Sequence, residues 1–221
     1  MKTVKGFGIL VSDEIYHYPG SGSLRNIKNY EQEKKLLDVC LNNIDKKNPV
    51  MIELGSFWAL WSIIFRKKFP SGTNILIEIF SKNLEIGVKN FLLNEIRERV
   101  IPYHGSICRD SSHCFKSKSR DDIGLDLDLY EILEKEKIES VDLLHCDIQG
   151  SELEFLKLYE HLLSNKVIKN IIIGTHTHLS DNKEIHHDVV KILNRNNYTI
   201  VHNFYNLGSD GYIYAKIDKG V

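Results

Sequence analysis

The residues best suited to acid–base chemistry in this 221-residue chain stand at the ends of two apolar runs. His145 and Asp147 close the run 141–147, and His176 follows the isoleucine-rich run 168–175. A neutral imidazole accepts a proton near neutral pH, and a carboxylate beside it can orient the ring. Packing alone explains polar side chains at such strand ends poorly. We therefore predict His176 as a general base and His145 as the second candidate. Asp147 would orient one of them, contact a ligand or only cap the next helix.

A second group of residues has the spacing of a nucleotide-binding turn. Gly55 follows a short apolar run, and a glycine before the small Ser56 permits a tight turn close to a ligand. Glu78 ends the next run, and 78 minus 55 gives a spacing of 23 residues. An acid that binds ribose hydroxyls is expected roughly 20 residues after the glycine. We therefore predict an adenosyl ligand across these two strands, with candidate contacts at Glu53, Gly55, Ser56 and Glu78.

Apolar runs bounded by turn residues predict the strands that position these groups. We expect strands at 49–55, 74–79, 100–105, 141–147, 168–175, 198–203 and 211–217. Helices are expected at 30–44, 57–69, 82–95, 129–137, 152–163 and 184–196, with loops over most of 1–29 and over 106–125. Strands that alternate with helices predict a parallel, doubly wound sheet. Only a short turn joins the last two strands, so these should form an antiparallel hairpin.

Composition limits the class of protein further. The net charge is −1, which argues against a partner bound through a large basic face, such as a nucleic acid. Four cysteines are too few for a disulfide scaffold. The most apolar stretch, 57–65, is far shorter than the roughly 20 residues that span a bilayer. The first residues lack a secretory signal pattern. We therefore expect a cytoplasmic protein without membrane insertion.

The segment 143–152, LLHCDIQGSE, resembles the strand-four segment of FkbM-like methyltransferases, DLL-(K/H)-ID-(V/I)-(E/Q)-GAE. The resemblance covers about residues 50–200. It includes Glu53 to Ser56, Glu78 with Asn83 and Asn94, and 173–176 followed by 184–186. This sequence departs from the family pattern at three positions. Phe57 and Ala59 stand where the family usually has Asn and Gly, and Ile79 stands where it has Pro.

The resemblance implies a Rossmann-like class I methyltransferase fold with a seven-stranded, mostly parallel sheet and a C-terminal antiparallel hairpin. It implies an S-adenosylmethionine-dependent O-methyltransferase that acts on a hydroxyl of a sugar, glycan or natural product. Ser106 would lie near the adenine, and Asp147 near the cofactor. Some related sugar methyltransferases hold magnesium with several carboxylates after strands four and five. Here His176 follows strand five, and imidazole suits magnesium poorly, so we expect no metal; a divalent cation on Asp147 and His176 is the alternative.

The resemblance also suggests how the chain divides. Residues 49–221 are enough for the S-adenosylmethionine-binding domain, which leaves 1–48 as an N-terminal extension with one helix. This extension would serve as a lid or as a contact with a second copy of the chain. Two other functions compete with methyl transfer. A catalytically inactive binding or scaffold protein would fit the changes at Phe57 and Ala59, whereas the missing glycines and the closing hairpin disfavour a nicotinamide-dependent oxidoreductase.

Overall fold

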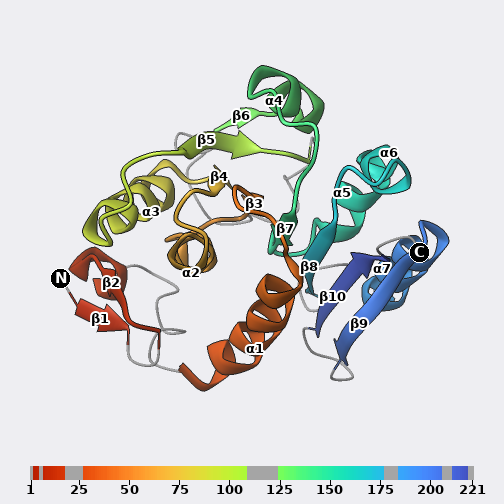
Figure 1. Ribbon diagram of the computed structural model, residues 1–221, viewed down its shortest axis with the longest axis horizontal. Helices are drawn as coiled ribbons and strands as arrows, with labels where there is room; N and C mark the ends of the chain where they lie inside the picture. The colour runs from red at the N-terminus through yellow and green to blue at the C-terminus, as the bar shows by residue number, and fades with distance from the viewer. Residues whose placement is uncertain are drawn as a thin grey trace.

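The protein is described by a computed structural model that covers residues 2–4, 7–17, 27–108, 124–176, 184–205 and 211–218. A small N-terminal hairpin contains β1 (Lys2–Val4) and β2 (Ile9–Val11). The main sheet contains β3 (Val50–Leu54), β4 (Thr73–Glu78), β5 (Val100–Ser106), β6 (Leu125–Asp126), β7 (Leu143–Cys146), β8 (Asn170–Thr175), β9 (Tyr198–Tyr205) and β10 (Gly211–Ile217). Their spatial order is β6-β5-β4-β3-β7-β8-β10-β9 (Figure 1).

The main sheet confirms the predicted topology. The pairs from β6 to β8 are parallel, whereas β10 is antiparallel to both β8 and β9. The prediction that 106–125 is a loop throughout was wrong at its end, because Leu125 begins β6 and pairs with Gly105. Two residues are too few to show a period, so this strand depends on its neighbour and leaves no sequence signal.

The helices are α1 (Ile27–Asn43), α2 (Leu60–Lys68), α3 (Ser81–Leu93), α4 (Leu129–Lys135), α5 (Glu152–Leu158), α6 (Glu160–Ser164) and α7 (Ile185–Arg195). One core lies between the sheet and α1–α3, and the other lies between the sheet and α4–α7 (Figure 1). The single helix predicted over 152–163 is two helices, broken at Tyr159. The buried Tyr159 hydroxyl accepts the backbone N–H of Leu129, which ties the break to α4.

The N-terminal residues are more ordered than the predicted loop. The hairpin β1–β2 and a short 3-10 helix, Asp13–His17, bury apolar side chains in the same core as α1–α3. Polar contacts add to this packing, because the Asn94 side chain both accepts from and donates to the backbone of Leu10. The division of the chain at residue 48 stays a prediction. The part of this extension at 18–26 lies outside the described residues, so the lid also stays a prediction.

Within the described part of the chain, no helix combines the length and the apolar character that crossing a membrane requires.

Candidate active site

Two neighbouring strand ends bring most of the predicted residues together. β3 and β7 pair in parallel, with Glu53 opposite His145. The loops that follow these strands also touch, since Asp147 donates its backbone N–H to the Leu54 carbonyl over 3.0 Å. The carboxyl edge of a parallel sheet is where ligands bind in folds of this type.

Gly55 is required by the close approach of these two loops. Its φ is +73°, a conformation that side-chain-bearing residues rarely adopt. A Cβ atom on Gly55 would lie 2.0 Å from the backbone oxygen of Asp147. The N–H groups of Gly55 and Ser56 both donate to the carbonyl of Ile77 in β4. The turn after β3 therefore connects the ends of β3, β4 and β7 through backbone hydrogen bonds.

Glu78 continues this edge at the end of β4. Its carboxylate accepts the backbone N–H groups of Phe57 (2.8 Å) and Phe80 (3.0 Å) and the side-chain amide of Asn83 (3.2 Å). Burial raises the pKa of Glu78, and the charge of Asp147 acts in the same direction. The side chain that we predicted as a ribose ligand therefore also holds the turn after β3 in place.

A buried trio of Glu33, Glu53 and His145 lies between α1, β3 and β7. Glu33 Oε1 is 2.9 Å from His145 Nε2, and Glu53 Oε1 is 4.0 Å from His145 Nδ1. Burial raises the pKa of Glu53 to about 7 and also raises that of Glu33. Burial alone would lower the pKa of His145, but the hydrogen bond and charge of Glu33 leave it raised. His145 is thus paired inside the protein, and its role as a second base stays a prediction.

His176 lies between two other carboxylates. Its Nδ1 is 2.6 Å from Glu152 Oε1, and its Nε2 is 3.3 Å from Asp147 Oδ1. Glu152 is fully buried and also accepts the backbone N–H groups of Ile148 (3.2 Å) and Gly150 (2.9 Å). These bonds fix the carboxylate, which in turn can fix the orientation of the imidazole. A base held by a third group is the usual arrangement in proton-transfer sites.

The same three side chains form the one candidate metal group found among the described residues. Ligand atoms of Asp147, Glu152 and His176 lie within 4.8 Å of one another. The two ring nitrogens face different carboxylates, however, and Glu152 already accepts two backbone N–H groups. Hydrogen bonds therefore account for this arrangement, and the expectation of no metal stays a prediction.

Comparison with known proteins decides the family. A model of the methyltransferase FkbM domain matches residues 56–200, which is more than half of the chain. The chain belongs to the FkbM methyltransferase family. This confirms the resemblance seen in the segment 143–152, and family and fold together indicate methyl transfer from S-adenosylmethionine. A search of curated protein sequences finds no match.

Solved structures show the same fold at low sequence identity. The METTL16 methyltransferase domain has a TM-score of 0.64 and 12% identity, over 98% of this chain and 76% of that one. TrmK of M. capricolum in complex with S-adenosylhomocysteine has a TM-score of 0.52 and 17% identity, over 83% and 68% of the two chains. Precorrin-6y C5,15-methyltransferase of Geobacter metallireducens has a TM-score of 0.51 and 13% identity, over 82% and 87%. These likenesses confirm the Rossmann-like methyltransferase fold.

Two buried oxygens fit the cofactor that the FkbM family implies. Ser56 Oγ and Asn83 Oδ1 are shielded from solvent and lack a hydrogen-bond partner. Buried polar atoms are normally paired, so an orphaned oxygen beside a nucleotide-binding turn suits a ligand group. Asn83 also donates to Glu78, so both orphaned oxygens belong to the edge described above. The residues present are therefore compatible with an adenosyl group.

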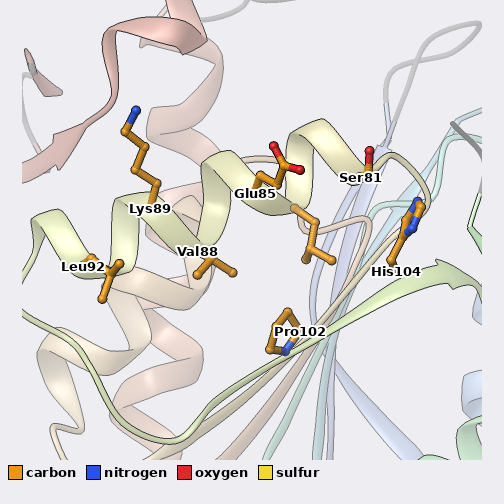
Figure 2. Close-up of a pocket in the computed structure, with 8 residues that line it drawn as sticks. Ser81, Glu85, Val88, Lys89, Leu92, Pro102 and His104 are labelled. Carbon is orange, nitrogen blue, oxygen red and sulfur yellow. The ribbon is translucent and has the colours of Figure 1, made fainter.

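Ser106 is not brought into this group by the contacts described. It ends β5, which β4 separates from β3, and its hydroxyl bonds to the backbone of Cys108 in the following loop. A separate open groove of about 510 Å³ lies between α3 and β5 (Figure 2). No predicted site residue lines this groove. Its lining consists of Ser81, Leu84, Glu85, Val88, Lys89, Leu92, Pro102 and His104. An adenine contact at Ser106 stays a prediction.

Three residues of the candidate site escaped the sequence analysis. Glu33 lies ahead of the range that matches the FkbM family, but it stands on the helical stripe that continues through Leu36, Leu37 and Cys40. A charged residue on an apolar stripe was the available signal. Gln149 and Glu152 lie inside the family-like segment. The motif marks their positions but not the partners of their side chains.

Proposed function

We propose that this FkbM-family protein is an S-adenosylmethionine-dependent O-methyltransferase whose acceptor is a hydroxyl of a sugar, glycan or other natural product. His176 is the general base, and Glu152 orients it. The family and fold support methyl transfer, and the 2.6 Å contact between Glu152 and His176 supports the choice of base. The alternative of a binding protein without catalysis is separated from this proposal by the assays below.

Methyl transfer to an alcohol needs proton removal because a neutral alkyl hydroxyl is a weak nucleophile. S-adenosylmethionine, when bound, supplies an electrophilic methyl group. Ser56, Gly55 and Glu78 would hold its adenosyl part. His176 accepts the proton of the acceptor hydroxyl at Nε2 as the oxygen approaches the methyl carbon to about 3 Å. Glu152 stabilises the resulting imidazolium through Nδ1, and the charge of Asp147 faces Nε2.

The charge of the site supports a neutral acceptor. Five carboxylates gather at this edge of the described structure: Glu33, Glu53, Glu78, Asp147 and Glu152. Among the described residues, these carboxylates form hydrogen bonds with backbone N–H groups, side-chain amides and imidazoles. Burial raises the pKa of Glu33, Glu53 and Glu78 and so reduces their charge, but a site lined by carboxyl groups offers a phosphate group no counter-charge. The proposed partner is therefore a small molecule or carbohydrate rather than a nucleic acid. We also propose that the protein acts in the cytoplasm.

Calorimetry tests the cofactor first. We expect micromolar binding of S-adenosylmethionine and S-adenosylhomocysteine and no binding of NAD. Failure of both adenosyl ligands to bind would contradict the proposal. Transfer is then measured with labelled S-adenosylmethionine over a panel of sugars, glycosides and polyols. Cofactor binding without transfer to any of them would favour the non-catalytic alternative.

With an acceptor found, His176→Ala and Glu152→Gln test the base. We expect His176→Ala to lower kcat by roughly 10²–10⁴-fold, as for loss of a general base. Glu152→Gln should also lower kcat, because an amide at this position can donate to Nδ1 and reverse the ring tautomer. His187→Ala is the control, since His187 is exposed on α7. Full activity of His176→Ala would remove the base assignment, and sensitivity to chelators would restore the metal alternative.

A further inference from the structure

Gln149 contacts the nitrogen of His176 that the proposed reaction needs. Gln149 Nε2 lies 3.2 Å from His176 Nε2 and 2.7 Å from Asp147 Oδ1. The backbone of Gln149 is left-handed, with φ 54°, and Gly150 follows with φ 105°. This conformation is unfavourable for a residue that carries a side chain, and such strain collects at functional sites. The turn directs the Gln149 amide back onto the site.

The contact with Asp147 determines which way the amide points. A carboxylate oxygen accepts hydrogen bonds, so the Gln149 atom 2.7 Å from Asp147 Oδ1 is the nitrogen and not the carbonyl oxygen. An amide nitrogen carries two N–H groups. One is donated to Asp147, and the other faces His176 Nε2. An amide nitrogen only donates, so this contact is a hydrogen bond when Nε2 is the acceptor and carries no proton.

The proton state of the ring follows from this assignment. With Nε2 bare, the single ring proton is on Nδ1, where it is donated to Glu152 Oε1. A neutral imidazole with a bare Nε2 is the form that a general base requires. One N–H of Gln149 thus stands where the O–H of an acceptor would be presented to His176.

Protonation of Nε2 makes this contact unfavourable. An imidazolium N–H and an amide N–H would then be two donors 3.2 Å apart. Asp147 Oδ1, 3.3 Å from Nε2, is placed to accept the new N–H. Asp147 can therefore exchange Gln149 for His176 as its donor when the base gains its proton.

We propose that Gln149 is a positioning residue that holds His176 neutral with Nε2 bare and is displaced by the acceptor hydroxyl. This proposal rests on the proposed function, because it assigns a partner to the same base. In the reaction the acceptor O–H bond breaks and its proton goes to Nε2. The oxygen forms the new bond to the methyl carbon, and the methyl carbon–sulfur bond breaks with its electron pair left on sulfur.

Two variants of the full chain distinguish the effect of the Gln149 side-chain amide from the effect of the left-handed backbone at residue 149. Gln149→Leu keeps side-chain bulk without N–H groups. Gln149→Gly removes the side chain and suits the left-handed backbone. Glu154→Gln is the control, because Glu154 is an exposed polar residue on α5. Imidazole nitrogen NMR reports the tautomer of His176, and peptide mass spectrometry reports its rate of modification by diethyl pyrocarbonate.

We expect the wild type and the control to show His176 with its proton on Nδ1 alone. Both Gln149 variants should show a mixture of tautomers and modification about threefold to tenfold faster, as for loss of one hydrogen bond. A proton on Nε2 in the wild type, or unchanged spectra and rates in both variants, would overturn the proposal. Neither measurement involves methyl transfer. A failure of the proposed function would therefore be seen in the wild-type transfer assay, whereas a failure of the proposal for Gln149 would be seen in the NMR spectra and modification rates.

Discussion

The acidic residues at the carboxyl edge of the sheet differ in role because they differ in partners. Glu78 is tied to two backbone N–H groups, and Glu152 to two backbone N–H groups and His176. Glu53, in contrast, faces the ring of His145 at 4.0 Å and accepts the backbone N–H of Ser62 at 3.2 Å. The burial of Glu53 is therefore compensated by fewer hydrogen bonds than that of Glu78 or Glu152.

This difference gives a prediction for Glu53. Burial raises its pKa in the folded protein from 4.5 to about 7. The folded state therefore holds this proton more tightly than the unfolded state, so its contribution to stability falls as pH rises from about 4.5 to 7. We expect Glu53→Gln to gain stability relative to the wild type between pH 5 and pH 8, as measured by urea unfolding at each pH. Glu154→Gln should show no such change, and a pH-independent difference for Glu53→Gln would contradict the raised pKa.

Sequence reasoning found only part of the site at this scale. Strand ends predicted that Gly55, His145 and Asp147 would meet, because neighbouring parallel strands end at one edge. They did not predict that Glu152 and Gln149 would turn back toward His176. Those contacts depend on left-handed φ angles in the loop 147–151, and a single sequence gives no sign of them where the residue is not glycine.

At the scale of elements, the start of α2 is set by strained backbone. Phe57 and Ala59 have φ values of 46° and 63°, in the region that favours Asn and Gly. Asn and Gly are the residues that the FkbM family usually has at these positions. The prediction of a helix from residue 57 was therefore wrong by three residues, because α2 begins at Leu60. The strain keeps the N–H of Phe57 directed at Glu78.

Ala59→Gly should relieve part of this strain. The left-handed conformation costs an alanine about 1–2 kcal/mol, and the added freedom of glycine in the unfolded chain offsets about 0.4–1 kcal/mol. We expect a net gain of about 0.5–1 kcal/mol in the free energy of unfolding, measured by urea denaturation. Ala215→Gly is the matched control, because Ala215 is equally buried without positive φ, and it should destabilise. A loss of stability in Ala59→Gly would show that the Ala59 methyl group matters more than the strain.

The strands were predictable because each is a short, buried apolar run. The misses have a common cause. Contacts with residues distant in the sequence determine three features: β6, the hairpin β1–β2 and the break between α5 and α6. Local composition does not indicate such contacts. Leu125 pairs with Gly105, Leu10 bonds to Asn94, and Tyr159 bonds to Leu129.

At the scale of the whole molecule, the described residues 2–4, 7–17 and 27–43 contribute to both the core and the site. The helix α1 brings Glu33 to His145, and β2 is fastened to α3 by side-chain amides. Ser12 donates its backbone N–H to Asn90 over 2.8 Å, and Asn94 holds the backbone of Leu10. The N-terminal residues are thus packed on the domain that the family describes.

Asn94→Ala tests this attachment. It removes two hydrogen bonds to the backbone of Leu10 and leaves part-buried backbone groups without partners. We expect a loss of about 1–3 kcal/mol in the free energy of unfolding. We also expect faster amide hydrogen exchange in β1–β2. Asn165→Ala is the control, since the Asn165 side chain makes an exposed contact within its own turn. Unchanged exchange in the hairpin would show that apolar packing alone holds it.

The order of the strands has a consequence for synthesis of the protein. β10 follows β9 in the chain, yet it lies between β8 and β9 in the sheet. A growing chain that has produced everything up to β9 still has an open, isoleucine-rich edge on β8. Exposed strand edges of this kind recruit other chains. A folding intermediate in which β10 has not yet paired therefore leaves the β8 edge open, and we expect such an intermediate to be prone to aggregation through strand pairing.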